Sequence, residues 1–472
     1  MKLWLWFIGL VAAAMIFWLG VSARHPRIPD QPLALLLTCD VHGRLVPCGC
    51  FSGQLGGLTR IATLFGRKTP DQIRVDAGDA IGGSADYERT QYRYIQQAFA
   101  ALGYDALNVG QGEARLSAAQ LRDLKAHAPV PMLSANLIDK STGAPLFDSY
   151  KIVERGRWRV AVAGVLDGRG MGEYLGDGLA VEEMDVALRR LLPQLRGRAD
   201  FIVLLAFADE TALTNLARQF YELDAILGGR VSEPSQQLVK ENRSLILATT
   251  NESHAVGRLE VALRAPRLLL PLKGEVKLVS DDIPQDAAIA ALAAAYRDEV
   301  RHAKLAIDDP ATLQEDMVPG VKPRDTYAGT ESCAPCHPAA CRAWRISDHA
   351  RAFATLVDVH ADADPNCLSC HTVGFGSATG YRRNLAGAGA LVDVGCESCH
   401  GPGSEHVQSR TSGGEIAPHL RAVGAGGCQK CHHGEFSRPF DYAEFWPLIA
   451  HGREPAAPSR AADIPGSRTR SR

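Results

Sequence analysis

Four copies of one short cysteine motif constrain this 472-residue chain more than any other feature. Each copy reads C-x-x-C-H, and the copies end at His337, His371, His400 and His432. Their eight thiols belong to Cys333, Cys336, Cys367, Cys370, Cys396, Cys399, Cys428 and Cys431. The two thiols of such a motif attach one c-type haem, and the His that follows binds its iron as the proximal ligand. The sequence therefore predicts four covalently attached c-type haems.

A zinc site or a redox dithiol is the alternative for a single C-x-x-C pair. Zinc ribbons have no fixed His after each pair, whereas all four copies here do. The motifs also follow one another so closely that the peptide between them cannot build an ordinary core. The haems themselves must then form the core, close enough for electrons to pass between them. This arrangement is typical of a multihaem electron carrier.

The N-terminus and the haem motifs both indicate export. Haem c is attached outside the cytoplasm, so we expect a periplasmic protein with redox partner proteins. Residues 3–19 are apolar and residues 21–23 resemble a cleavage site, so residues 1–23 are either a removed signal peptide or an uncleaved anchor in the inner membrane. The formal net charge of −2 gives no support for nucleic-acid binding.

The N-terminal half alternates short apolar runs with amphipathic stretches. Apolar runs at 33–38, 160–165 and 201–205 have the character of buried strands, whereas apolar residues in 92–102 recur at helical spacing. Such alternation predicts a layered α/β domain with functional loops at the strand ends.

The composition changes further along the chain and suggests where domains begin and end. We expect an α/β domain over 33–283, then a connecting helix and a polar linker over 284–325. A mostly α-helical, haem-cored domain follows over 326–452. Residues 453–472 contain no core-forming pattern and are expected to be a disordered tail.

Loop motifs of the α/β domain carry a family resemblance. They read D-V-H-G at 40–43, D-A-G-D at 76–79, N-V-G-Q-G-E at 108–113, S-A-N-L at 134–137 and G-G-R-V-S at 228–232. In order and spacing this set resembles the 5'-nucleotidase branch of the calcineurin-like metallophosphoesterases. The resemblance implies a four-layer α/β/β/α sandwich. It also implies that Asp40, His42 and Asp79 are ligands of the first of two metals, with Asp79 bridging to the second.

The departures from that family concern the second metal and the catalytic His. Gln111 and Gly112 stand where the family has Asn and His, and the later ligand His is replaced near Phe207. Arg230 and Ser232 replace the two His of the family's G-H-x-H motif. Two-metal hydrolysis needs both ions to stabilise the attacking and leaving oxygens. Phosphatase activity is therefore doubtful, although one divalent metal, Zn or Mn, could still bind.

Three cysteines accompany the residual metal site. Cys39 precedes Asp40, and Cys48 and Cys50 follow on the same loop. Thiolates could hold a soft metal such as zinc together with the neighbouring ligands. A disulfide among the three is the alternative in an exported protein.

The C-terminal domain has a resemblance of its own. Its motifs are Y-A-G at 327–329, W-R-I-S-D-H-A at 344–350, C-E-S-C-H-G-P-G-S-E-H at 396–406 and F-W-P-L-I-A-H-G at 445–452. They resemble the tetrahaem cytochrome c-554 family of ammonia-oxidation electron transfer. The resemblance implies that His349, His406 and His451 are distal haem ligands. It also implies a five-coordinate second haem, the one of His371, unless His360 or His419 fills that position.

The leading hypothesis is an exported tetrahaem electron-transfer protein with a phosphoesterase-like docking or sensing domain. A haem oxidoreductase acting on a small nitrogen or sulfur compound at an open iron is the first alternative. A metal-dependent phosphoesterase of the 5'-nucleotidase type is the second.

Overall fold

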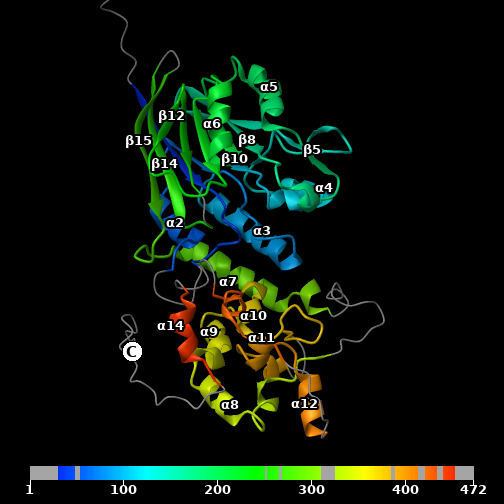
Figure 1. Cartoon of the computed structure of the whole chain (residues 1–472). Coiled ribbons are helices and arrows are strands. Elements are labelled where there is room, and N and C mark those ends of the chain that lie inside the picture. The colour runs from blue at the N-terminus through cyan, green and yellow to red at the C-terminus, as the bar shows by residue number, and fades with distance from the viewer. Residues whose placement is uncertain are drawn as a thin grey trace, which may run out of the picture.

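The computed structural model describes residues 30–47, 54–249, 252–264, 268–309, 325–383, 388–412, 420–421, 423–432 and 440–451. They form an α/β body and a smaller, mostly helical domain below it (Figure 1). None of the helices in these ranges is long and apolar enough to cross a membrane. The predicted signal peptide or anchor and the predicted disordered tail lie outside the described residues.

The first six-stranded sheet has the order β15-β14-β1-β2-β3-β4. Its strands are β1 (Gln31–Thr38), β2 (Gln72–Asp76), β3 (Ala106–Asn108), β4 (Met132–Leu133), β14 (Ala255–Arg264) and β15 (Leu268–Leu278). Strands β1 to β4 run parallel to one another, so their C-terminal ends meet at one edge, whereas β14 pairs with β1 in antiparallel fashion. In open α/β sheets this edge is where ligands bind.

The second six-stranded sheet has the order β12-β13-β11-β10-β8-β7. Its strands are β7 (Tyr150–Arg155), β8 (Trp158–Leu166), β10 (Phe201–Phe207), β11 (Ala225–Gly229), β12 (Val239–Glu241) and β13 (Ser244–Ala248). The inner four are parallel and the outer two antiparallel. A small third sheet contains β5 (Leu137–Asp139), β6 (Ala144–Pro145) and β9 (Leu179–Val181).

Strand β10 shows why the body has four layers. Phe201, Val203 and Leu205 point into the core shared by the two sheets, whereas Ile202 and Leu204 point into a second core against helices. Successive strand residues face opposite sides, so a strand covered on both sides is apolar throughout. The predicted α/β/β/α sandwich is confirmed.

Helices cover the outer faces of both sheets (Figure 1). They are α2 (Leu58–Phe65), α3 (Asp86–Ala101), α4 (Ala118–His127), α5 (Met184–Leu195) and α6 (Glu210–Gln219), with short 3-10 turns η1 (Glu113–Arg115) and η2 (Gly172–Tyr174). Helices α2 and α3 pack on the first sheet as part of the larger core, and α5 and α6 pack on the second sheet in the second core.

Helix α7 (Ala287–His302) joins the two parts of the protein and is followed by the turn η3 (Ala306–Asp308). It buries Ile289, Tyr296 and Val300 in the core of the body, as its apolar spacing predicted. The Tyr296 hydroxyl also donates to Oδ1 of Asp364 in the helical domain, at 3.1 Å. The predicted connecting helix is thus an integral part of both domains.

A buried arginine strengthens the same junction from the other side. Arg383 of the helical domain has only 4% of its side chain exposed and pairs with Asp308. Its guanidinium also donates to the carbonyl oxygens of Val300 and Ala363, at 2.6 and 3.2 Å. Charged hydrogen bonds of this kind hold two segments in one orientation.

The helical domain has short helices and little apolar core. The helices are α8 (Pro338–Arg345), α9 (Ala352–Asp358), α10 (Pro365–His371), α11 (Cys396–His400), α12 (Ser404–Thr411), α13 (Ala425–Cys428) and α14 (Tyr442–Phe445), with 3-10 turns η5 (Thr330–Ser332), η6 (Asp348–Arg351), η7 (Ala388–Leu391) and η9 (Trp446–Leu448). The buried apolar cluster found in its described part comprises six residues, Leu356, Ala361, Leu368, Val373, Tyr381 and Leu391. Such a small cluster fits a domain whose interior is completed by prosthetic groups.

Candidate metal and haem sites

Three predicted metal ligands meet at the C-terminal ends of β1 and β2. Asp40 and His42 follow β1, and Asp79 follows β2, which is paired in parallel with β1. One ligand atom from each of the three lies within 4.8 Å of the others. Two carboxylates and one imidazole suit a divalent ion such as Mn²⁺ or Zn²⁺. This donor set therefore fits one metal ion.

All three residues have left-handed backbone conformations. Their φ angles are 52° at Asp40, 45° at His42 and 66° at Asp79. Each such residue costs on the order of 1–3 kcal/mol, and such strain clusters at functional sites. Backbone hydrogen bonds from Asp40 to Gly78 (2.8 Å) and from His42 to Asp79 (3.1 Å) tie the two loops together. The fold thus holds the three side chains toward a common point.

Glu113 fixes the second loop, a role that the sequence analysis did not assign. Its fully buried carboxylate accepts hydrogen bonds from the backbone N–H groups of Asp79, Ala80, Ile81 and Gly110, at 2.8–3.1 Å. The signal was present in the sequence, because Glu113 is the last residue of the N-V-G-Q-G-E motif. It is a positioning residue for Asp79.

The electrostatics of the site favour a cation. Burial, with repulsion from Glu113 and Asp40, raises the pKa of Asp79 to about 8. Burial also raises the pKa of Asp76, which accepts hydrogen bonds from Thr38 Oγ1 at 2.7 Å and from Gly78 N at 2.9 Å. Buried carboxylates that repel one another are stabilised when a metal ion displaces the proton.

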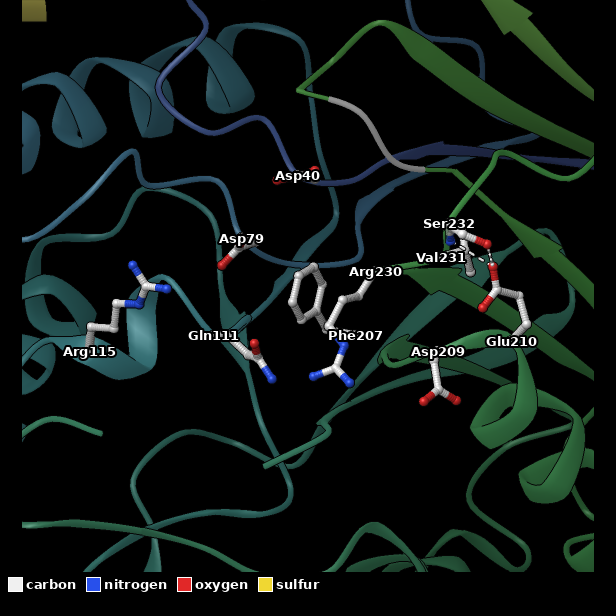
Figure 2. A pocket seen from close by; sticks show the side chains of 10 residues that line it. All are labelled: Asp40, Asp79, Gln111, Arg115, Phe207, Asp209, Glu210, Arg230, Val231 and Ser232. Atoms are coloured by element: carbon white, nitrogen blue, oxygen red, sulfur yellow. Dashed lines mark hydrogen bonds between the residues drawn. The ribbon is translucent and has the colours of Figure 1, made fainter. Parts of the chain in front are cut away.

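A pocket of about 470 Å³ opens beside these ligands (Figure 2). It is lined by Asp40, Asp79, Gln111, Arg115, Phe207, Asp209, Glu210, Arg230, Val231 and Ser232. Figure 2 shows the Phe207 ring and the Arg230 side chain side by side near Asp79. Neither an aromatic ring nor a guanidinium is a metal ligand, so these residues do not fit the second metal.

Gln111 and Arg230 are also held away from a ligand role by their own partners. The Gln111 amide donates to the Asp167 carbonyl oxygen at 2.8 Å. The Arg230 guanidinium pairs with Asp167 Oδ2 at 3.1 Å, and the Asp167 side chain is buried. Arg169 pairs with the same carboxylate at 2.7 Å.

Cys39 lies in the core and outside the ligand cluster. Its thiol is fully buried, forms no disulfide and donates to the Gly78 carbonyl oxygen at 3.4 Å. Burial raises the pKa of this thiol well above its ordinary value, which opposes the thiolate form that binds metals. The structure thus places Cys39 apart from Asp40, His42 and Asp79. Cys48 and Cys50 lie outside the described residues.

In the helical domain, histidines of three motifs face histidines from elsewhere in the chain. The ring centroids are 6.2 Å apart for His337 and His406, 6.0 Å for His349 and His432, and 5.8 Å for His400 and His451. Two imidazoles on opposite sides of one metal ion, each bound at about 2 Å, have centroids about 6 Å apart. The geometry therefore fits one iron between the two rings of each pair.

Backbone hydrogen bonds orient several of these rings. The Nδ1 atoms of His371, His400 and His451 lie 2.6, 3.0 and 3.0 Å from the carbonyl oxygens of Ala352, Arg421 and Ile449. A carbonyl oxygen only accepts, so each Nδ1 carries the proton and leaves Nε2 available for a metal. Burial lowers the pKa of His349, which favours the neutral ring that ligates iron.

Attachment thiols of different motifs lie close together. The Cys333 thiol of the first motif contacts that of Cys396 in the third. The Cys370 thiol of the second motif contacts that of Cys431 in the fourth. Cys399 of the third motif also lies near Cys428 and Cys431 of the fourth. His360 is exposed at the end of α9, and His419 lies outside the described residues.

The fold and these sites define a two-part protein, in which a phosphoesterase-type α/β/β/α body is joined to a c-type multihaem domain. Comparison with known proteins agrees. Residues 332–401 match the family described as cytochrome c554 and c-prime. The chain is 35% identical over 92 residues to cytochrome c-554 of Nitrosomonas europaea, covering 16% of this chain and 39% of that one.

The chain is also 28% identical over 246 residues to the 5'-nucleotidase of Vibrio cholerae, covering 44% of this chain and 42% of that enzyme. A 5'-nucleotidase precursor structure from Thermus thermophilus is similar with a TM-score of 0.50, 24% identity, and 57% and 59% coverage. A calcineurin-like phosphoesterase from Bacillus subtilis gives a TM-score of 0.50, 18% identity, and 57% and 98% coverage. The chain spans less than half the length of the two sequence relatives. The N-terminal part therefore has the 5'-nucleotidase-type fold, and the C-terminal part is similar in sequence to the cytochrome c554 family.

Proposed function

We propose that the protein is an exported electron carrier with four covalently bound c-type haems, one on each C-x-x-C-H motif. The observation that carries this proposal is the set of three histidine pairs with ring centroids 5.8–6.2 Å apart. Each pair joins a motif histidine to a histidine outside the motifs. Haem supplies one-electron redox chemistry, and the chain holds the iron and shapes its surroundings.

The pairs support a set of axial ligands for three haems. His406 is the distal ligand of the first haem (proximal His337), His451 that of the third (His400) and His349 that of the fourth (His432). Two histidines keep an iron six-coordinate in both oxidation states, which limits reorganisation during electron transfer. This favours a carrier over an enzyme at these three irons.

The α/β body serves as a docking or sensing domain that binds one divalent cation at Asp40, His42 and Asp79. Hydrolysis at this site is disfavoured because Phe207 and Arg230 occupy the neighbourhood where a second ion would bind. Location in the periplasm and redox partner proteins follow from the haem chemistry. Residues 1–23 act as a removed signal or as an anchor.

Intact mass and metal content test the proposal directly. The protein is exported in a host with haem-maturation machinery, and its mass should exceed the peptide mass by four haems. A gain of two haems or fewer refutes the architecture. Spectroscopy of His406→Ala should show one low-spin haem converted to high-spin. His302→Ala is the control, because His302 is an exposed residue of α7. Equal spectra for the two variants would refute the ligand assignment.

A further inference from the structure

The aromatic rings beside His432 are a feature of the helical domain that haem attachment does not require. Phe440 stacks on the His432 imidazole, with ring centroids 5.0 Å apart and an angle of 16° between the planes. Phe445 lies 6.5 Å from the same imidazole and packs against Phe440 at 5.3 Å. Aromatic rings at such distances attract one another when they are offset or tilted. The two phenylalanines thus form an aromatic wall against one predicted iron ligand.

The aromatic wall belongs to a short structured segment near the C-terminus. Phe440 directly precedes Asp441, which caps α14 by accepting hydrogen bonds from backbone N–H groups of the first turn. The Phe445 backbone N–H donates to the Asp441 carbonyl oxygen at 3.0 Å. The same segment ends in His451, the proposed distal ligand of the third haem. It therefore contacts the ligands of two haems, and its helix holds both phenylalanines in place.

The opposite ring of the pair, that of His349, is held through its backbone. Its carbonyl oxygen accepts a hydrogen bond from the Val394 N–H at 3.1 Å. The Trp344 Nε1 atom donates to the Val394 carbonyl oxygen at 2.8 Å. The ring planes of His349 and His432 are 53° apart, compared with 27° in the pair of the first haem. The two ligands of the fourth haem are therefore far from parallel.

Contacts with one axial ligand affect a haem in two ways. An imidazole bound to iron can turn about the iron–nitrogen bond, but such a turn would drive the His432 ring into the face of Phe440. The angle between two axial imidazole planes determines how the iron d orbitals split, and the g values of ferric haem report that splitting. Apolar surroundings also raise the potential, because they disfavour the positively charged ferric centre relative to the neutral ferrous one.

We propose that Phe440, supported by Phe445, is a positioning residue of the fourth haem. It fixes the plane of the His432 imidazole, and its apolar ring raises the potential of that haem. The inference rests on the proposed ligand pair of His349 and His432 and adds how the second of these rings is held. A phenyl ring offers no iron ligand, so Phe440 acts only through His432 and its surroundings.

Electron paramagnetic resonance and redox titration of the haem-containing full chain test the proposal. His349→Ala identifies the low-spin ferric signal of the fourth haem as the one that disappears. In Phe440→Ala we expect the g values of this signal to shift and the potential of the fourth haem to fall. Phe440→Tyr keeps a flat ring and should restore the g values of the unsubstituted protein. Phe440→Leu keeps apolar volume without a flat ring, so its g values should shift while its potential falls less than in Phe440→Ala.

Tyr442→Ala is the matched control, because Tyr442 also lies on α14 but stacks on Trp446, at 5.4 Å. It should leave the signal and the potential of the fourth haem unchanged. Unchanged g values in Phe440→Ala, or equal shifts in Tyr442→Ala or Phe440→Tyr, overturn the positioning role. An unchanged potential in Phe440→Ala overturns the effect on the potential. If His349→Ala removes no low-spin signal, the ligand pair itself is refuted, so failure of the proposed function is distinguishable from failure of this inference.

Discussion

The junction between the two domains should depend on the single side chain of Arg383. Replacement by Met keeps the length and apolar volume of the stem and removes the charge. The Asp308 carboxylate, 13% exposed, then loses its partner. The carbonyl oxygens of Val300 and Ala363 also lose their hydrogen bonds from the Arg383 guanidinium, which are 2.6 and 3.2 Å long.

The expected size of the effect follows from burial. Removal of one partner of a buried ion pair costs about 3–5 kcal/mol, because the other charge is left uncompensated. Arg345 provides a matched control, because its pair with Glu331 is solvent-exposed, with 52% and 75% of the two side chains accessible. Exposed pairs contribute only about 0–1 kcal/mol, so Arg345→Gln should unfold at nearly the same urea concentration as the unsubstituted protein.

Urea unfolding followed by two signals measures the effect. The Soret band reports the helical domain, and far-ultraviolet circular dichroism reports mainly the α/β body. For Arg383→Met we expect a lower midpoint and separation of the two curves, which should coincide in the parent. Adding Asp308→Asn should recover part of the loss, since both partners are then uncharged. The reasoning would be refuted if the two curves of Arg383→Met coincided and its free energy of unfolding fell no more than that of Arg345→Gln.

Three further outcomes follow from the sites. His451→Met should raise the potential of one haem, because Met/His ligation favours reduced iron; an unchanged redox titration would contradict the assignment of His451. AMP turnover with Mn²⁺ should stay far below about 1 s⁻¹, the low end of typical enzymes; faster turnover that disappears in Asp79→Ala would restore the hydrolase alternative. Because the pKa of Asp79 is raised to about 8, its carboxyl carries a proton below that pH that a cation must displace. The affinity for Mn²⁺ should thus rise up to about tenfold per pH unit toward pH 8 and then level off, and a flat profile from pH 6 to 8 would show that Mn²⁺ displaces no proton from Asp79.

Much of the fold was predictable because its signals are local. The apolar runs that form β1, β8 and β10 are buried on both faces. A continuous apolar run identifies such a strand without knowledge of its neighbours in the sheet. The grouping of Asp40, His42 and Asp79 was predicted from the family resemblance, and the parallel pairing of β1 with β2 brings the three residues together.

Other features depend on contacts between distant segments and could not be read from periodicity. Helix α7 has the pattern of an ordinary amphipathic helix, and nothing in that pattern shows that Tyr296 reaches Asp364. The hydrogen bonds accepted by the Glu113 carboxylate depend on loop geometry, because the donors are backbone N–H groups that the sequence does not identify. Cys39 seemed a candidate ligand because it adjoins Asp40, yet the end of β1 turns its side chain into the core.

The histidine pairs also affect how such a protein can be made. His337 faces His406, and His432 faces His349, so each pair joins segments that leave the export channel at different times. Under the proposed ligand assignment, the distal ligand of the first haem leaves the channel after the third motif, whereas the distal ligand of the fourth haem leaves it before that haem is attached. With this assignment, haem attachment precedes the final topology of the chain. Formation of the axial pairs is then a late, long-range folding step, slowed by the entropy of forming large loops.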